Sequence, residues 1–206
     1  MSEKYSQNDE EEVLLKLFAD HGTGRFMDIG AYDGKCFSNT LKLAEMGWEG
    51  VCVEPSPSCF AALLANHSEH PKVDIVNAAI TASNTPELVK FYDSGGDAIS
   101  STDVGHKHKW ESGHACTFKE FWVQSLPLVA LLHRFGHTWD FMNIDVESTN
   151  MDIFSALLMT SCRPQVICVE HDGSADKMLE LLNGSGATTE PYHEVMRNGE
   201  NIIVAR

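Results

Sequence analysis

The segment Asp28-Ile29-Gly30-Ala31-Tyr32-Asp33-Gly34 joins an apolar run to a helical pattern, at a place where glycine lets a ligand approach the backbone. Its spacing, Asp-x-Gly-x-x-x-Gly, differs from the Gly-x-Gly-x-x-Gly pattern that seats a pyrophosphate on a helix N-terminus. Tyr32 stands where that pattern has its second glycine, and its side chain would crowd the phosphate. Asp28 would repel a phosphate, but it is suited to order the loop and to help hold a cationic amino group.

A second acidic residue, Glu54, ends the next apolar run, 24 residues after Gly30. An acid at this strand end accepts hydrogen bonds from the two hydroxyls of a ribose. Together the loop and Glu54 predict a ligand with an adenosine and an amino acid but no phosphate, which is S-adenosylmethionine. The competing interpretation is that Asp28 and Glu54 only cap helices and that the glycines only turn the chain. Asn77, after a third strand, is either a hydrogen-bond partner of the adenine edge or an ordinary turn residue.

Four further polar residues follow two later apolar runs: Asp145, Glu147, Glu170 and His171. In an open parallel sheet the carboxyl ends of the strands form the ligand crevice, so these side chains are expected to converge. One interpretation is general base catalysis by His171 or by a carboxylate with a raised pKa. A second is a divalent cation held by Asp145, Glu170 and His171. A third is that the acids cap helices or order loops and that His171 is solvated.

The elements that would position these residues alternate between strand and helix, which predicts a parallel α/β sheet with helices on both faces. Asn198-Gly199 between two strand-like runs predicts a final antiparallel hairpin. The expected strands cover 25–31, 50–54, 73–80, 139–146, 165–170, 193–196 and 201–205, and the expected helices cover 9–19, 36–46, 58–66 and 151–159.

The middle of the chain is less regular. Residues 87–92 are a possible strand, and 118–135 is expected to be helical in part, with a break or start at Pro127. Residues 94–116 form a Gly/Ser/His-rich segment that predicts a lid or substrate loop. Its His106, His108, His114 and Cys116 match no closed zinc spacing. Trp110, Phe121 and Trp122 offer flat faces for a sugar, although Phe121 and Trp122 are expected in the core.

Length and composition bound the remaining possibilities. The 206 residues fit one domain over 1–206, with an N-terminal helix and linker at 1–24. Fifteen Lys and Arg residues against thirty Asp and Glu residues give a net charge of −15, which disfavours nucleic acid as a partner. No apolar stretch reaches the roughly 20 residues of a membrane span. The acidic N-terminus is unlike a signal peptide, and the six cysteines form no CxxC pair, so a cytoplasmic location is expected.

Five segments in order resemble FkbM-type S-adenosylmethionine-dependent methyltransferases over about residues 25–205. They are Phe26 to Gly34, Gly47 to Pro55, Asn77 to Ile80, Asp140 to Glu147 and Pro164 to His171. The resemblance implies a three-layer Rossmann-like class I methyltransferase fold, with a mostly parallel seven-stranded sheet that ends in an antiparallel hairpin. The chain departs from the family at Asn143, where Lys is usual, and at Ser148, where Gly is usual. Ser100 and Ser101 match a serine-containing stretch of the family.

The sequence therefore predicts methyl transfer from S-adenosylmethionine to a hydroxyl of a small molecule or glycan, in particular a sugar. The alternatives are a non-catalytic S-adenosylmethionine-binding module and an NAD-type oxidoreductase. The candidate cofactor-binding residues are Asp28, Gly30, Ala31, Gly34, Glu54, Pro55, Asn77, Ala78, Ser101 and Asp145. The candidate catalytic residues are His171, Asp145, Glu147 and Glu170.

Overall fold

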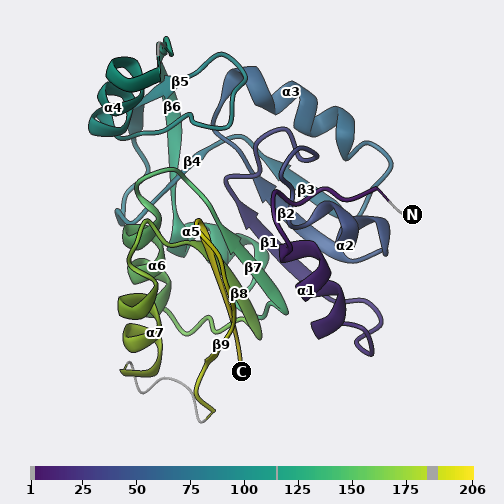
Figure 1. Cartoon of the computed structure of the whole chain (residues 1–206). Helices are drawn as coiled ribbons and strands as arrows, with labels where there is room; N and C mark the ends of the chain where they lie inside the picture. Colours follow the sequence, from purple (N-terminus) through teal and green to yellow (C-terminus); the bar gives the residue numbers. More distant parts are fainter. Residues whose placement is uncertain (1–2, 115, 185–189) are drawn as a thin grey trace.

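The computed structural model describes residues 3–114, 116–184 and 190–206 (Figure 1). The first two residues of the expected N-terminal segment and residue 115 of the expected lid lie outside the described residues. In chain order the elements are α1 (Glu10–Leu17), β1 (Arg25–Ile29), α2 (Leu41–Glu45), β2 (Glu49–Val53), α3 (Pro57–Asn66), β3 (Val73–Val76), β4 (Ala79–Thr81), β5 (Leu88–Asp93), α4 (Val104–His114), β6 (Lys119–Pro127), α5 (Leu128–Phe135), β7 (Phe141–Ile144), α6 (Asn150–Leu158), β8 (Val166–Glu170), α7 (Ala175–Gly184), β9 (His193–Arg197) and β10 (Asn201–Ala205).

Seven strands form the main sheet in the order β3-β2-β1-β7-β8-β10-β9. β1 pairs in parallel with β2 on one side and with β7 on the other, whereas β10 runs antiparallel to β8 and β9. The predicted parallel α/β sheet with a final hairpin is confirmed. The chain reverses its direction of winding between β1 and β7, and such a switch point is where open α/β sheets bind ligands.

Helices cover both faces of this sheet, which gives three layers (Figure 1). Successive side chains of a strand point to opposite faces. In β1, Phe26 therefore packs with Leu14, Trp48 and other residues of the α1–α3 side, while Met27 packs with residues of α5, α6 and α7 such as Leu131. Burial of each large side chain contributes about 1.5–3 kcal/mol, so the two cores hold the strand ends in register.

A second, three-stranded sheet in the order β4-β6-β5 lies beside α4 at the upper left of Figure 1. In the segment 118–135, expected to be helical in part, strand β6 runs through Pro127, and α5 begins directly after that residue. Because side chains alternate along β6, Val123 is buried while Trp122 is 67% exposed, so the expectation that Trp122 lies in the core is wrong. Phe121 packs partly buried against the core of this sheet.

Three other expected boundaries differ from the structure. The expected strand 73–80 is divided between β3 and β4, which belong to different sheets. The expected helix 36–46 is restricted to α2, because the Asp33 carboxylate accepts hydrogen bonds from the backbone N–H groups of Lys35 and Cys36 and Phe37 has φ 60°. The segment expected to be an irregular loop contains α4. Among the described residues, no helix combines the length and apolar character needed to cross a membrane.

Candidate functional site

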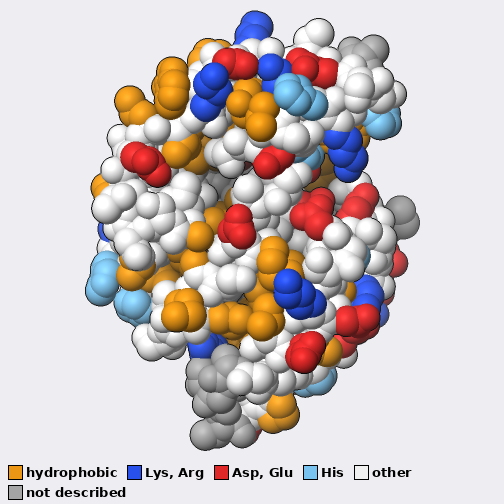
Figure 2. All heavy atoms as spheres, turned by 90° about the vertical axis from the view of Figure 1, so that its left-hand side faces the viewer, with side chains coloured by type: hydrophobic (Ala, Val, Ile, Leu, Met, Phe, Trp, Pro, Cys, Tyr) orange, Lys and Arg blue, Asp and Glu red, His pale blue; other side chains and the backbone are white. Residues whose placement is uncertain are grey.

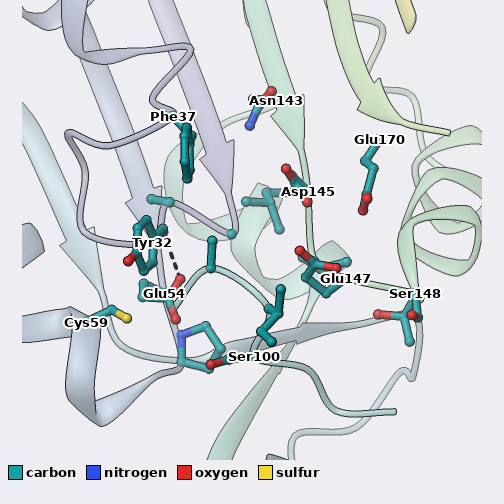
Figure 3. Close-up of a pocket in the computed structure, with 18 of the residues that line it drawn as sticks. Tyr32, Phe37, Glu54, Cys59, Ser100, Asn143, Asp145, Glu147, Ser148 and Glu170 are labelled. Carbon is teal, nitrogen blue, oxygen red and sulfur yellow. Dashed lines mark hydrogen bonds between the residues drawn. The ribbon is translucent and has the colours of Figure 1, made fainter. Parts of the chain in front are cut away.

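A cavity of about 380 Å³ opens where the carboxyl ends of β1, β2, β7 and β8 meet the 97–110 segment (Figure 3). This volume is typical of small-molecule sites. Its lining includes most of the predicted site residues: Asp28, Gly30, Ala31, Glu54, Pro55, Ala78, Asp145, Glu147 and Glu170. Gly34, Asn77, Ser101 and His171 do not line it.

The two predicted glycines have different reasons to be glycine. Gly30 has φ +90°, and a Cβ there would lie 1.6 Å from the backbone oxygen of Asp145. It is therefore required for β1 and β7 to converge at the cavity. Gly34 has φ +74°, and its Cβ would lie 2.5 Å from Leu63 and 2.8 Å from His67. The expectation that Gly34 lies against the ligand is thus corrected, because it fits the loop against α3.

Glu54 lies at the end of β2 and is 6% exposed. Its two carboxylate oxygens accept hydrogen bonds from the backbone N–H groups of Tyr32 (2.9 Å) and Ser56 (2.7 Å). Burial raises the pKa of Glu54 to about 8. A carboxylate has about four lone-pair positions, so two remain for hydroxyl groups in the cavity.

Asn77 does not reach the cavity that Glu54 lines. Its side-chain amide donates to the backbone oxygens of Glu54 (2.8 Å) and Pro55 (3.4 Å). The adenine contact considered for Asn77 is replaced by a structural role: the side chain holds the segment that follows β2.

Asp28 belongs to a buried polar network rather than to an ion pair. Its carboxylate accepts hydrogen bonds from Thr40 Oγ1 (2.6 Å) and Asn143 Nδ2 (2.9 Å). Asn143 Oδ1 in turn accepts from Asn39 Nδ2 (3.1 Å). Burial raises the pKa of Asp28 above its ordinary value. The amide of Asn39 is buried and lines the cavity, and its Oδ1 has no hydrogen-bond partner among the described residues, so an acceptor is available to a bound donor.

Asp145, Glu147 and Glu170 converge from the ends of β7 and β8, as predicted, and one oxygen from each lies within 4.8 Å of the others (Figure 3). Burial and the neighbouring charges raise the pKa of Asp145 well above its usual range, and they raise the pKa of Glu147 to about 8. Three acids this close are suited to balance positive charge.

His171 lies outside this group, which corrects its predicted role. Its Nδ1 accepts a hydrogen bond from the backbone N–H of Gly173 (2.9 Å), and its Nε2 lies 3.2 Å from the backbone oxygen of Asn198. A neutral imidazole has one donor and one acceptor, so both are used. His171 thus has no free lone pair to act as a base, and it does not join Asp145 and Glu170 as a ligand set. It ties the 171–173 turn to the β9–β10 hairpin.

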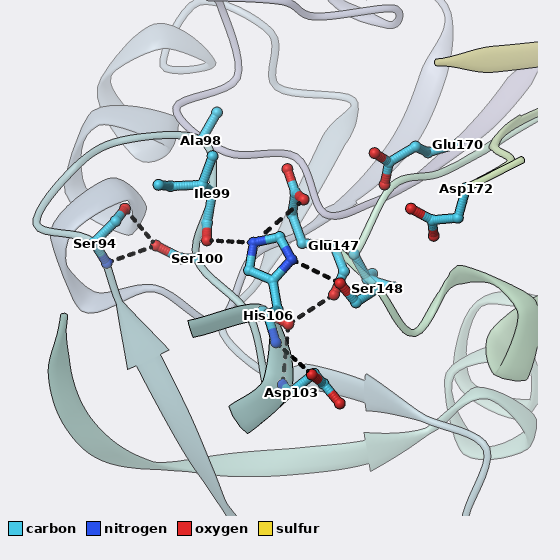
Figure 4. Close-up of polar contacts among 12 residues, drawn as sticks. Ser94, Ala98, Ile99, Ser100, Asp103, His106, Glu147, Ser148, Glu170 and Asp172 are labelled. Atoms are coloured by element: carbon cyan, nitrogen blue, oxygen red, sulfur yellow. Dashed lines mark hydrogen bonds and ion pairs between the residues drawn. The ribbon is translucent and has the colours of Figure 1, made fainter. Parts of the chain in front are cut away.

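His106 lines the cavity, although it is not among the candidate site residues predicted from the sequence. It is 5% exposed, and its Nδ1 lies 2.6 Å from Ser148 Oγ (Figure 4). Its Nε2 lies 3.1 Å from the backbone oxygen of Ile99 and 3.6 Å from a carboxylate oxygen of Glu147. Burial lowers the pKa of His106. No spacing in the sequence marked this residue, because α4 brings it to the end of β7 from a separate part of the fold.

Ser101 supports this region from behind the cavity. Its hydroxyl donates to the backbone oxygen of Glu147 (2.7 Å) and accepts from the backbone N–H of Asp103 (3.0 Å). The predicted cofactor contact at Ser101 is therefore corrected to a contact that joins the segment before α4 to the end of β7. The neighbouring Ser100 does line the cavity.

The fold is a Rossmann-like α/β fold, and solved methyltransferase structures share it. The chain aligns with a precorrin-6y C5,15-methyltransferase from Geobacter metallireducens (12% identity, TM-score 0.52, covering 100% of this chain and 93% of that one). It also aligns with an O-methyltransferase from Bacillus cereus in complex with SAH (15% identity, TM-score 0.50, covering 100% of this chain and 84% of that one). A third match is the METTL16 methyltransferase domain (14% identity, TM-score 0.53, covering 95% of this chain and 63% of that one). At these identities the likeness shows the fold.

The family is shown by sequence. The methyltransferase FkbM domain matches residues 28–197, and the chain belongs to this family. It is an S-adenosylmethionine-dependent methyltransferase, which decides against the NAD-type oxidoreductase and the non-catalytic module. A search of curated proteins gave no significant match.

Proposed function

We propose that the protein transfers a methyl group from S-adenosylmethionine to a hydroxyl of a small molecule or glycan, with a sugar as the preferred acceptor class. The observation that carries the proposal is the division of one cavity into two acidic sides. Asp28 and Glu54 lie at the ends of β1 and β2, and Asp145, Glu147 and Glu170 lie at the ends of β7 and β8.

The first side fits the cofactor. Glu54 retains lone pairs for the ribose hydroxyls, and the unpartnered Asn39 Oδ1 is an acceptor for the ammonium group. Gly30, Ala31, Pro55 and Ala78 line the cavity between these groups with little side-chain bulk. When bound, S-adenosylmethionine supplies an electrophilic methyl group on a positively charged sulfur. The protein's contribution is to align the acceptor with it and exclude water.

The second side fits an uncharged, hydroxyl-rich acceptor. Trp110 lines the cavity, and its indole N–H has no hydrogen-bond partner among the described residues. An aromatic face with a free donor is suited to a sugar ring. The carboxylates of Glu147 and Glu170 are acceptors for its hydroxyls.

Charge argues against a nucleic acid acceptor. The net charge is −15, and the lysines that gather over β5, β6 and α4 in Figure 2 are partly neutralised. Lys90 and Lys107 both pair with Glu120 (3.1 Å each).

All six cysteines are free thiols. Such thiols persist in reducing compartments, so the proposed location is the cytoplasm.

Two measurements test this function. Calorimetry should show binding of S-adenosylhomocysteine and none of NAD. Release of S-adenosylhomocysteine should then be measured in separate reactions with methyl glycosides, with an RNA oligonucleotide and with a peptide as the methyl acceptor. Turnover with the glycosides alone supports the proposal, whereas turnover with the RNA or the peptide alone contradicts the acceptor class.

A further inference from the structure

Apart from the carboxylates, a hydrogen bond at the cavity joins a serine hydroxyl to a buried imidazole. Ser148 is exposed, lines the cavity and directs its Oγ to His106 Nδ1 at 2.6 Å (Figure 4). We propose that Ser148 Oγ takes the proton of the acceptor hydroxyl and gives its own hydroxyl proton to His106 Nδ1. This proposal rests on the methyl transfer to a hydroxyl proposed above.

The direction of the hydrogen bonds follows from the partners of the imidazole. The backbone oxygen of Ile99 can only accept, so His106 Nε2 carries the ring proton and donates to it. His106 Nδ1 then holds the lone pair, and the Ser148 hydroxyl donates to it. The Ser148 oxygen retains lone pairs that can accept from a hydroxyl in the cavity. A chain of two proton transfers is therefore in place.

The backbone at this point indicates that the hydroxyl has a purpose. Glu147 and Ser148 have φ 53° and 71°, a conformation that costs non-glycine residues roughly 1–2 kcal/mol each. Ser101 holds the backbone oxygen of Glu147, and Asn150 holds the backbone N–H of Val146 (2.8 Å). The local fold thus imposes a glycine-like conformation, yet the chain has a serine whose side chain contacts His106.

The proposed step balances as follows. The acceptor O–H bond breaks and its proton joins Ser148 Oγ, while the Ser148 proton joins His106 Nδ1. The electron pair left on the acceptor oxygen forms the bond to the methyl carbon, and the pair of the old carbon–sulfur bond stays on sulfur. The positive charge that sulfur loses appears on His106, where Glu147 lies 3.6 Å from Nε2.

The charged groups around His106 come from several elements. Asp103 and Lys109 belong to α4 and the residue before it, Glu147 follows β7, and Asp172 follows β8. The three acids favour the imidazolium, whereas Lys109 and burial oppose it. Since the base must be neutral before the step, the rate is expected to rise with pH as His106 loses its proton.

The first test compares Ser148→Ala and His106→Asn in the full chain. Both should bind S-adenosylhomocysteine within about twofold of the unchanged protein, but lose at least about 100-fold in the rate of methyl transfer to the best methyl glycoside. His106→Asn should also lose the rise in rate with pH. The matched controls are Ser112→Ala and His108→Asn, which change exposed residues of α4, the helix that contains His106. Both controls should keep the normal rate.

The second test needs no acceptor. Nitrogen NMR of the protein with S-adenosylhomocysteine should show His106 with a protonated Nε2 and an Nδ1 resonance that moves in Ser148→Ala. A protonated Nδ1, or a normal transfer rate in Ser148→Ala, overturns the proposal. Failure of the unchanged protein to bind S-adenosylhomocysteine would instead overturn the proposed function.

Discussion

At the scale of single residues, Glu54 binds the backbone N–H groups of Tyr32 and Ser56 and is the residue proposed to contact the ribose of the cofactor. Glu54→Gln keeps the size of the side chain but removes the charge. At pH 9, above the pKa of about 8 that burial gives Glu54, we expect binding of S-adenosylhomocysteine to weaken by roughly 1–3 kcal/mol, because hydrogen bonds from the ribose to a charged group are lost. Titration calorimetry measures the change, and Glu180→Gln, an exposed residue of α7, is the control. Equal affinities for all three proteins would contradict the role of Glu54.

Ser148 gives a second prediction at this scale, about stability rather than binding. Ser148→Gly and Ser148→Ala both remove the hydroxyl, but only glycine relieves the left-handed backbone at φ 71°. We expect the glycine variant to be more stable than the alanine variant by about 1 kcal/mol. Urea unfolding with matched slopes measures the difference. If the alanine variant unfolds at the same or higher urea concentration, the conformation of residue 148 is not the strained one.

At the scale of elements, the strand ends decide which residues meet. The buried runs and their alternation with helices predicted β1, β2, β7 and β8, and with them the positions of Asp28, Glu54, Asp145 and Glu170. The same reasoning could not separate His171 from Glu170, its neighbour in the chain. The orientation of the His171 side chain depends on its tertiary contact with Asn198 in the β9–β10 hairpin, which no local sequence pattern reveals.

Local patterns also failed where the second sheet forms. Residues 118–126 carry apolar groups that fit either helix or strand, and the choice depends on pairing with β5, about thirty residues earlier. The polar segment before it contains α4, which has one buried side chain, His106, among its described residues. A helix with so small an apolar face leaves no periodic signal, so His106 could not be placed at the cavity.

The junction of β1 and β7 is where an element-scale prediction is sharpest. In Gly30→Ala the new Cβ would lie 1.6 Å from the backbone oxygen of Asp145, and residue 30 has φ +90°. The strands must separate, so we expect a loss of at least about 3 kcal/mol of stability or no folded protein. Thermal unfolding is the measurement. Gly113→Ala in α4 has open space around its Cβ and should unfold at the normal temperature.

At the scale of the whole molecule, eight of the thirty Asp and Glu residues line one cavity. Lys109 is the one Lys or Arg among its described lining residues. The lining acids are Asp28, Glu54, Asp97, Asp145, Glu147, Glu170, Asp172 and Glu200. Net charge alone predicted repulsion of nucleic acid, but not that so many acids would line one cavity. The acids there repel one another, and binding of a cationic cofactor at the proposed position would relieve this repulsion.

This arrangement makes stability fall with pH in the absence of cofactor. Glu54 and Glu147 have pKa values of about 8 in the folded protein, against 4.5 for the exposed side chain. Below pH 4.5 both states are protonated, whereas between 4.5 and 8 the unfolded chain has released protons that the folded protein retains. Stability is thus lost as pH rises through this window. Calorimetric scans from pH 5 to 8.5 should show a falling unfolding temperature, less steep in Glu54→Gln.

Binding of S-adenosylmethionine should reverse this trend. Its positive charge favours the ionised carboxyls, so binding near pH 7 should release protons and the affinity should rise between pH 6 and 8.5. Titrations in buffers of different ionisation enthalpy count the protons released. S-adenosylhomocysteine has a neutral sulfur and should release fewer, which makes it the matched control. Proton uptake, or equal release by both ligands, would show that the sulfonium does not lie near these acids.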